Sequence, residues 1–334
     1  MNIRSHADAD PAETIHAAGR RFRVVERLTT ESNSAAHVCR DENGELVVVK
    51  RAPRARDALG SGASELTAQM RQMEAVRPLA PTGLYPPILA RDGRTMVIPF
   101  YPEGSAEALV RSDPAGAVDV LSAAFDALFA VAGAVGSRPA AASESMDAEL
   151  SSRARRLQRC LDAEPSRALL EATSGRPVSS LVADLVGGVR VGVSGRMAVA
   201  AHGDLIPPNV VIAPGGVRFI DVRGRLPWRG GLPWWDPLLD VAAVLAWLRG
   251  AEALGDPIRA RGIETALIER LAASSAFARW SSTDRAWARR LGLAIAAKLL
   301  GKVSIELVYG GRDRDARALL MWELFRAHLA ALTG

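Results

Sequence analysis

Two kinds of hydrophobic pattern follow one another along the chain. Residues 21–50 contain runs rich in β-branched side chains, joined by a turn at Asp41–Gly44, and this pattern is typical of a β-hairpin. Residues 63–77 then show apolar positions at helical spacing, and two short strands are expected at 88–90 and 95–98. The first part of the chain is therefore predicted to be a small β-rich lobe with one helix.

From residue 105 onwards the pattern is mainly helical, with one strand-like block at 189–222. The apolar spacing predicts helices over residues 114–135, 144–163, 164–172, 176–188, 237–249, 257–275, 283–309 and 312–332. This order of elements indicates an α+β chain with two lobes. Its expected parts are a polar tail or short helix at 1–20, a β-rich N-lobe at 21–99, a hinge at 100–104 and a helical C-lobe at 105–334.

Composition places the chain among globular proteins. Of its 334 residues, 49% are hydrophobic and 24% are charged, which is enough apolar material for two domains or one two-lobed unit. The formal net charge is +5, and only three of the 42 basic residues are lysines: Lys50, Lys298 and Lys302. Because the arginines are spread over the chain and interleaved with acids, nucleic-acid binding is not expected.

Several classes of site and location are disfavoured by the residues present. Two cysteines, Cys39 and Cys160, cannot build a disulfide scaffold or a cysteine-based zinc site, and the five histidines form no metal-binding motif. The longest apolar runs, such as Val241–Leu248, are shorter than a membrane span, and residues 1–20 lack the apolar core of a signal peptide. A cytoplasmic protein without membrane contact is therefore expected.

The segment 197–224 carries the most informative polar residues. A predicted strand leads into His202 and Asp204, Asn209 follows five residues later, and a tight hairpin then ends at Asp221. Singly, such residues usually cap turns or end strands. Together they place two carboxylates and an amide at strand ends and in the loop between them.

Phosphoryl transfer from a nucleotide needs this set of groups. One carboxylate orients the attacking hydroxyl and accepts its proton, while a second carboxylate and an amide oxygen hold Mg²⁺. The segment therefore favours a kinase of some kind over other enzymes. A P-loop NTPase and an α/β-hydrolase are not supported, because neither motif occurs in the chain.

The runs HGDLIPPN and FIDVRG resemble the catalytic and metal-binding segments of the aminoglycoside phosphotransferase family. That family is the small-molecule branch of the two-lobed protein-kinase-like fold. In this chain, HGD takes the place of the general kinase motif HRD, and DVR takes the place of DFG. The resemblance implies that Asp204 is the catalytic base and that Asn209 and Asp221 are ligands of Mg²⁺.

Two neighbouring residues gain supporting roles from the same resemblance. His202 would brace the catalytic loop, although a satisfied core histidine is the simpler interpretation. The later run Asp236–Asp240 is close to a family motif at the start of a helix, so Asp240 would hold the catalytic loop by hydrogen bonds. Asp236 is equally well explained as a helix N-cap.

The resemblance extends to the β-rich lobe. Lys50 ends a strand, as the phosphate-gripping lysine of the family does, and Glu65 on the following helix is expected to pair with it; Glu74 is the alternative partner. The loop before β-rich residues 37–50 lacks glycine, so Ser32 and Ser34 are expected to donate hydrogen bonds to the phosphates there. ATP and GTP both remain open as the phosphoryl donor.

The hinge and the acceptor site are expected on either side of the catalytic segment. Residues 96–104 resemble the hinge that meets the nucleotide base, which implies contacts from Ile98 and Phe100. Beyond Asp221, the run DVRG resembles a subgroup associated with bacterial capsule and sugar-nucleotide genes. The candidates for binding the acceptor are Arg223, Arg225, Trp228 and Trp234, and packing of this loop is the alternative.

These observations predict a small-molecule kinase that phosphorylates a hydroxyl of a sugar-bearing acceptor, possibly an antibiotic. The basic chain favours a neutral or anionic acceptor over an aminoglycoside. The alternatives are a sugar kinase of primary or cell-surface polysaccharide metabolism and a non-catalytic nucleotide-binding module, which the glycine-free loop favours. A protein kinase is disfavoured, because about fifteen residues after Asp221 leave no room for an activation loop. The oligomeric state is left open.

Overall fold

The computed structural model describes most of the chain and divides it into two compact units. The described residues are 13–28, 35–52, 63–139, 146–162, 166–180, 183, 196–224, 226–282, 284, 286–309 and 311–333. The first unit comprises residues 1–127 and 201–233, and the second comprises residues 128–200 and 234–334. The expected hinge and the expected catalytic segment therefore belong to the same unit as the β-rich region.

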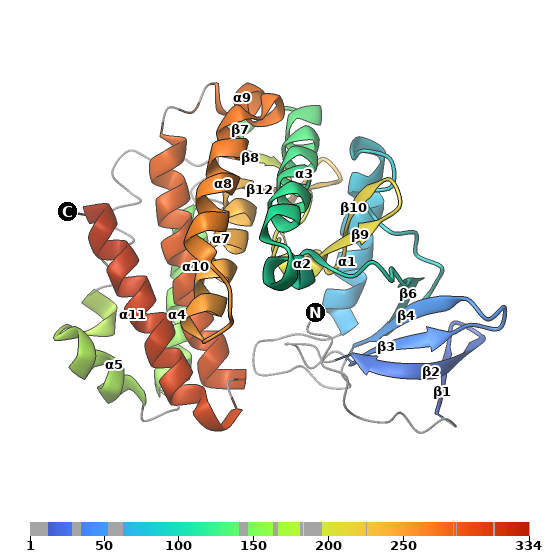
Figure 1. Cartoon of the computed structure of the whole chain (residues 1–334), viewed down its shortest axis with the longest axis horizontal. Helices are drawn as coiled ribbons and strands as arrows, with labels where there is room; N and C mark the ends of the chain where they lie inside the picture. Colours follow the sequence, from blue (N-terminus) through green and yellow to red (C-terminus); the bar gives the residue numbers. More distant parts are fainter. Residues whose placement is uncertain are drawn as a thin grey trace. The chain divides into compact units, whose positions relative to one another are not determined.

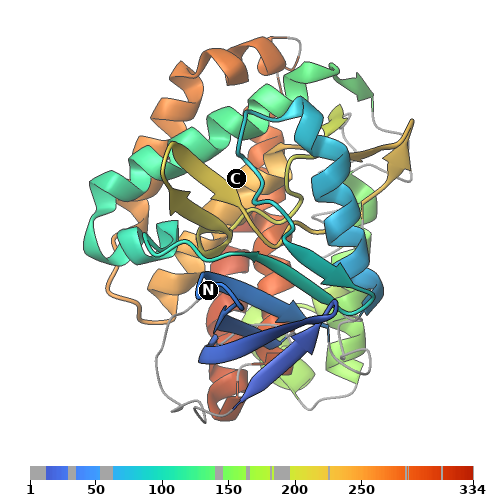
Figure 2. The ribbon, with the colours of Figure 1, turned by 90° about the vertical axis from the view of Figure 1, so that its right-hand side faces the viewer.

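The first unit contains a six-stranded antiparallel sheet in the order β1-β2-β3-β4-β6-β5, whose blue and teal strands are seen in Figures 1 and 2. Its strands are β1 (Thr14–Ala17), β2 (Arg20–Leu28), β3 (Ala35–Arg40), β4 (Leu46–Arg51), β5 (Ala90–Asp92) and β6 (Thr95–Pro99). The predicted turn Asp41–Gly44 joins β3 to β4, in a register that pairs Val38 with Val48. The hairpin expected from the sequence is thus present.

Strand β1 was not expected, because residues 1–20 were predicted to be a tail or short helix. In the structure, Ile15 and Ala17 are buried while Thr14 and His16 are exposed, which is the alternation of a strand with one buried face. Four residues with this alternation gain more from pairing with β2 than from a single isolated helical turn.

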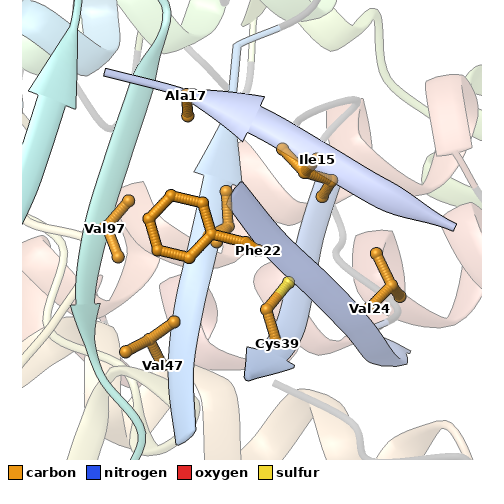
Figure 3. Close-up of a cluster of buried hydrophobic side chains, with 8 residues drawn as sticks. Ile15, Ala17, Phe22, Val24, Cys39, Val47 and Val97 are labelled. Carbon is orange, nitrogen blue, oxygen red and sulfur yellow. The ribbon is translucent and has the colours of Figure 1, made fainter. Parts of the chain in front are cut away.

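One face of the sheet carries an apolar core centred on Phe22. Figure 3 shows its ring between Val97 and Cys39, with β1 crossing the cluster. The members of this cluster are Ile15, Ala17, Phe22, Val24, Cys39, Val47, Val49 and Val97. Burial raises the pKa of the Cys39 thiol to about 12, so this cysteine serves as an unreactive core residue.

The opposite face carries a second apolar cluster, made of Leu28, Ala36 and Val38 with Leu46, Val48 and Phe100 packed against them. Because side chains alternate along β4, Lys50 lies on the same face as Val48. Helix α1 (Ala63–Val76), which matches the predicted helix closely, follows in the chain and ends in the short 3-10 helix η1 (Arg77–Leu79).

A hairpin completes the chemistry-bearing part of the first unit. The 3-10 turn η3 (Pro207–Asn209) leads into β9 (Val210–Ala213), which pairs with β10 (Gly216–Phe219). The N–H of Ile212 donates to the carbonyl of Gly104 at 2.9 Å, and Ser105 forms a β-bridge with Val211 just before α2 (Ala106–Ser112). The segment predicted as a hinge is therefore fastened to this hairpin at its C-terminal end.

The second unit is mainly helical, and its long helices α7, α10 and α11 lie side by side in Figure 1. Its helices are α4 (Met146–Asp162), α5 (Ser166–Ser174), α7 (Leu238–Ala253), α8 (Ala260–Ala273), α9 (Ser275–Ser281), α10 (Trp287–Tyr309), η4 (Gly311–Asp313) and α11 (Arg314–Thr333). The sequence pattern anticipated these helices apart from α9 and η4, and most of the expected helix 176–188 lies outside the described residues.

Helix α3 (Pro114–Ala134) and strand β12 (Leu232–Trp235) each cross a boundary between the segments of the two units. Strand β8 (Arg196–Val199) pairs with β7 (Arg138–Pro139) and with the second half of β12 (Leu232–Trp235). The first half of β12 pairs with β11 (Trp228–Arg229) in a hairpin that the sequence analysis treated as a loop.

Helix α3 (Pro114–Ala134) departs from the expectation that no apolar run is long enough for a membrane. An 18-residue window of this 21-residue helix has a mean hydropathy of 1.7, so by length and composition alone the helix could span a bilayer. More than half of that window, 56%, is buried inside the protein, and the core helix of a soluble protein meets the same criteria. This helix is weak evidence for a membrane segment.

A buried group of charges lies at the start of α7. The Arg290 guanidinium contacts the Asp236 carboxylate at 2.6 Å and the Asp284 carboxylate at 2.5 Å, and all three side chains are at most 7% exposed. Asp236 also accepts a hydrogen bond from the N–H of Leu238 at 3.1 Å. The N-cap residue of α7 is Pro237 rather than Asp236, whose carboxylate lies one residue earlier and combines its bond to the first turn with a buried ion pair.

Candidate active site

The segment from His202 to Asp221 is held in shape by one fully buried histidine. The N–H of Asp204 donates to His202 Nδ1 at 3.2 Å, so Nδ1 carries no proton. His202 Nε2 therefore carries the hydrogen and donates it to the carbonyl of Ile220 at 2.8 Å. A neutral imidazole thus ties the residues around Asp204 to those around Asp221. These bonds fit a satisfied core histidine as well as a brace, and the role of His202 in a catalytic loop stays a prediction.

Asn209 forms the second tie within this segment. Its side-chain Nδ2 donates to the backbone carbonyl of Asp204 at 3.2 Å, and the backbone carbonyl of Asn209 accepts a hydrogen bond from the N–H of Ile220 at 3.0 Å. Because the amide nitrogen is directed at Asp204, the amide oxygen is directed elsewhere. The side chain of Asp204 itself is exposed, as expected of a group that meets an acceptor molecule.

Two glycines in this segment are required by their surroundings. Gly203 has φ +92°, and a Cβ there would lie 2.9 Å from the Cβ of Arg223. Gly224 has φ +72°, and a Cβ there would lie 2.6 Å from the backbone nitrogen of Gln69 on α1. The glycine of the HGD run therefore allows close approach of side chains, and that of the DVRG run close approach of the α1 backbone, at conformations that other residues rarely adopt.

Asp221 occupies an uncommon backbone conformation, with φ +55°. Its carboxylate lies 2.5 Å from the Lys50 ammonium, and the side chains are 32% and 11% exposed. Burial by itself raises the pKa of Asp221, but the Lys50 ammonium outweighs this effect and holds that pKa below its usual value. Asp221 is therefore ionised at neutral pH, as a metal ligand has to be.

The helix partner of Lys50 differs from the prediction. In the described part of the chain, the Lys50 ammonium contacts Asp221 and, at 3.5 Å, Gln69 Oε1; it makes no ion pair with Glu65. Glu65 and Gln69 are four residues apart and share a face of α1, so the helix places the second of them level with the lysine. The alternative partner, Glu74, instead pairs with Arg91 at the protein surface.

Gln72 is a site residue that the sequence analysis missed. It is fully buried on α1; its Nε2 donates to the carbonyl of His202 at 2.9 Å, and its Oε1 accepts the N–H of Gly224 at 2.9 Å. A glutamine on an apolar helical stripe, three residues from Gln69, is the only signal in the sequence that could have indicated it. No local pattern connects it to residues more than a hundred positions away.

Solved structures of small-molecule kinases resemble this chain over nearly its whole length. A choline kinase from Cryptosporidium parvum has a TM-score of 0.61 at 9% identity, covering 93% of this chain and 90% of its own. A macrolide 2'-phosphotransferase type I has a TM-score of 0.51 at 13% identity, covering 89% and 91%. A glucosamine kinase has a TM-score of 0.50 at 15% identity, covering 92% and 94%.

No protein-family model and no curated protein sequence matches the chain. The structural likeness nevertheless decides the fold. The chain has a protein-kinase-like fold. The expected α+β class, with a β-rich N-terminal part and a mainly helical C-terminal part, is thereby confirmed. At identities this low the likeness concerns the kinase-like fold, and the aminoglycoside branch stays a prediction.

The face of the sheet that carries Lys50 also carries the residues predicted to contact the nucleotide base, Ile98 and Phe100. Phe100 packs on the apolar cluster of this face, and its N–H donates to the carbonyl of Leu46 at 3.2 Å. Ile98 is buried opposite Val48. Next to them in the chain, burial raises the pKa of Tyr101, an effect that Arg218 of the hairpin partly opposes.

Each described residue among the predicted acceptor residues has its own neighbours in the structure. Arg223 lies in the first unit, where its N–H donates to the carbonyl of His202 at 3.0 Å. Trp228 is covered by Arg71 of α1, with the guanidinium 4.1 Å from the ring centroid, so one ring face is already occupied. Trp234 belongs to the second unit and stacks with Arg138 at 4.8 Å.

Four of the predicted residues are not placed against the site. Ser32, Ser34 and Arg225 lie outside the described residues. Asp240 is fully buried in the first turn of α7, which belongs to the second unit. Its hydrogen bonding to the catalytic loop therefore stays a prediction.

The donor set fits a hard divalent cation. Asn209 presents an amide oxygen and Asp221 an ionised carboxylate, and oxygen ligands of this kind suit Mg²⁺, which binds through one or two protein groups plus phosphates and water. Within the described residues, no three histidine, cysteine, aspartate or glutamate side chains gather as a metal cluster.

Proposed function

We propose that the protein is a small-molecule kinase that transfers the γ-phosphoryl group of ATP or GTP to a hydroxyl of a sugar-bearing acceptor. The observation that carries this proposal is the contact between Lys50 and Asp221, with Asp204 and Asn209 tied to the same segment by His202. This arrangement combines a cation for phosphate, two oxygen ligands and an exposed carboxylate within one compact unit.

Each side chain has a distinct task in the proposed reaction. The exposed carboxylate of Asp204 orients the acceptor hydroxyl and accepts its proton as the oxygen bonds to the γ-phosphorus. The bond between the γ-phosphorus and the β,γ-bridging oxygen breaks in the same transfer, and the nucleoside diphosphate leaves. The Lys50 ammonium neutralises charge on the phosphates, and Asn209 and Asp221 supply oxygen ligands. Mg²⁺, when bound there, supplies further neutralisation of phosphate charge. Because no covalent intermediate is needed, catalysis rests on positioning and electrostatics.

The nucleotide base is proposed to lie on the apolar cluster beside Lys50, near Ile98 and Phe100. The β-branched and aromatic side chains of this face suit a flat base, and neighbouring backbone groups of the hinge supply hydrogen bonds to its edge. Ser32 and Ser34 are proposed to contact the phosphates, and Glu65, which does not pair with Lys50, is proposed only to lie near this site.

The acceptor is proposed to carry a sugar, with an antibiotic as one possible case. The three kinases compared above act on choline, glucosamine and a macrolide, so the fold accommodates small alcohols, amino sugars and glycosylated antibiotics alike. The glucosamine kinase supports a metabolic sugar kinase as the second candidate. The aminoglycoside phosphotransferase resemblance and a cytoplasmic location remain part of this proposal.

Turnover of Mg²⁺·ATP and Mg²⁺·GTP against a panel of acceptors tests the proposal. The panel contains neutral sugars, amino sugars, choline, nucleosides, macrolides and aminoglycosides. The wild type is expected to phosphorylate at least one of them, and Asp204→Asn is expected to lose about 10²–10⁴-fold in kcat while binding nucleotide unchanged. Asp313→Asn, at an exposed surface aspartate, is the control and should retain wild-type turnover.

Two outcomes would contradict the proposal. If the wild-type protein binds neither ATP nor GTP and turns over no acceptor, the protein is not a kinase. Nucleotide binding without any turnover, together with an Asp204→Asn variant that behaves like wild type, would favour the non-catalytic module.

A further inference from the structure

The side-chain amide of Gln72 bridges two separate backbone segments of the candidate active site. Its Nε2 donates to the carbonyl of His202, two residues before Asp204, and its Oε1 accepts the N–H of Gly224, three residues after Asp221. A carbonyl can only accept and a backbone N–H can only donate, so the orientation of the amide is determined by its two partners. Both bonds are 2.9 Å long and the side chain is fully buried.

We infer that Gln72 is a positioning residue, through which helix α1 sets the distance between the proposed base Asp204 and the proposed metal ligand Asp221. The inference rests on the proposed function of those two residues. These two bonds are made to backbone groups, and they hold the backbone on one side of Asp204 and on one side of Asp221. The two segments are also joined directly, by the Arg223 N–H and the His202 carbonyl at 3.0 Å.

The same helix also contacts the lysine. Gln69 and Gln72 are three residues apart and therefore lie on one face of α1, where Gln69 Oε1 is 3.5 Å from the Lys50 ammonium. One helix face thus contacts the strand that carries Lys50, the segment before Asp204 and the segment after Asp221. A shift of α1 would move all three groups relative to one another, and displacements of about 1 Å can cost about 100-fold in rate.

The chemistry of glutamine is specific to this place. A buried side chain that donates to one backbone group and accepts from another needs a donor and an acceptor about one amide apart. Methionine has a similar shape but offers neither bond. Glutamate keeps the acceptor for the Gly224 N–H, but when ionised it turns a second acceptor toward the His202 carbonyl.

Three kinetic and structural readouts test the role of Gln72, with Mg²⁺·ATP as the nucleotide and the best acceptor of the panel. Gln72→Met is expected to lower kcat about 10- to 100-fold while leaving the Kd of Mg²⁺·ATP unchanged. Amide hydrogen exchange of Gly224 is expected to accelerate in this variant, because its acceptor is lost. Thr67→Ala, at an exposed position of the same helix, is the control and should match wild type in every readout.

Gln72→Glu provides a test that a purely structural role would not pass. At low pH the protonated carboxyl can donate to the His202 carbonyl and accept from Gly224, as the amide does. As the pH rises and the carboxyl ionises, that donor is lost. The ratio of the variant's kcat to that of wild type is therefore expected to fall with rising pH. If Gln72→Met does not fold, this pH profile decides the question.

Several results would overturn the inference. A folded Gln72→Met protein with the kcat of wild type would contradict it, whether or not Gly224 exchange accelerates. A ratio of the Gln72→Glu kcat to the wild-type kcat that does not vary with pH would also contradict it. If wild type itself turns over no acceptor, the proposed function fails separately. In that case Gly224 exchange still decides whether the amide bridge exists, and unchanged exchange in Gln72→Met would rule it out.

Discussion

Lys50 and Asp221 stand 171 residues apart in the sequence, and their ammonium and carboxylate groups lie 2.5 Å apart in the structure. Lys50 ends a strand of the six-stranded sheet, and Asp221 follows a hairpin that belongs to the same compact unit. Asp221 has a positive φ, a backbone conformation that a residue other than glycine rarely holds without support from its surroundings. The ion pair and the hydrogen bonds of His202 provide that support.

Replacement of Lys50 by methionine is expected to destabilise the protein in a pH-dependent way. At pH 7 the free energy of unfolding should fall by about 1–3 kcal/mol, because the partly buried Asp221 carboxylate loses its counter-charge. The lowered pKa of Asp221 means that its stabilising contribution is present above the unfolded-state value of about 4 and is lost as the pH falls through the folded-state value. The difference between variant and wild type should therefore shrink below about pH 4.

The ion pair of Arg91 with Glu74 is the matched control for this experiment. It has the same 2.5 Å separation, but its side chains are 54% and 47% exposed. Arg91→Met is expected to change the free energy of unfolding by less than about 1 kcal/mol. Equal effects of both substitutions in urea unfolding curves at pH 7 would contradict the special stabilisation assigned to the Lys50 pair.

Alanine at Gly224 is expected to be much more disruptive than alanine at Gly215. Both glycines have positive φ, +72° and +81°, but a Cβ at Gly224 meets the Gln69 backbone nitrogen at 2.6 Å and a Cβ at Gly215 meets nothing within 4 Å. Gly215→Ala should cost about 1–2 kcal/mol of backbone strain, and Gly224→Ala more than about 3 kcal/mol. Thermal unfolding of both variants measures the difference. Similar losses would mean that α1 moves away without cost.

Substitution of Arg290 by methionine is expected to destabilise the second unit strongly. Asp236 and Asp284 would then be buried without their shared cation, which should cost about 3–5 kcal/mol in the free energy of unfolding. Burial already raises the pKa of Asp236, opposed by Arg290, so loss of the guanidinium raises it further. The double variant with Asp236→Asn should recover part of the loss. A double variant no more stable than Arg290→Met would show that charge is not the cause.

The stability of the protein is expected to depend on His328 between about pH 5 and pH 7. Its Nδ1 accepts from Arg249 at 2.8 Å and its Nε2 donates to the Gly292 carbonyl at 2.9 Å, so the native contacts need the neutral ring. Burial, together with Arg249, lowers its pKa. The unfolded chain therefore binds a proton first, and stability is present above about pH 6.5 and declines as the pH falls toward the folded-state value.

Urea unfolding across this pH range measures that contribution. Its slope should not exceed about 1.4 kcal/mol per pH unit, which corresponds to one proton. His328→Gln, which retains polar contacts without titrating, is expected to flatten the dependence. His16→Gln, at an exposed position on β1, is the control and should follow the wild-type curve. An unaltered pH dependence in His328→Gln would assign the effect to other groups.

Local patterns predicted most of the secondary structure. A run of β-branched residues placed Lys50 at the end of a strand, one residue before the observed end of β4, and apolar spacing located α1, α3 and α10 to within a few residues. Short elements were missed, because β1, β11 and α9 are stabilised by their neighbours and carry too few residues for a period to be visible.

The candidate site was predictable where its residues lie close together in the chain. His202, Asp204, Asn209 and Asp221 fall within one strand-loop-hairpin unit, so their spacing indicated that they lie close together. The roles that the family resemblance implies for them stay predictions. The helix partner of Lys50 was predicted wrongly, because spacing could not tell Gln69 from Glu65 on the same helix face.

The order of residues by itself determined which groups can perform chemistry and on which strands and turns they lie, since those depend on neighbours within a few positions. Tertiary structure alone decided which of them meet. The contacts of Lys50 with Asp221, of Gln72 with His202 and of Gln72 with Gly224 join positions 171, 130 and 152 residues apart. Such contacts depend on how far α1 is rotated and shifted against the sheet and hairpin, and the packing of their apolar faces sets that placement.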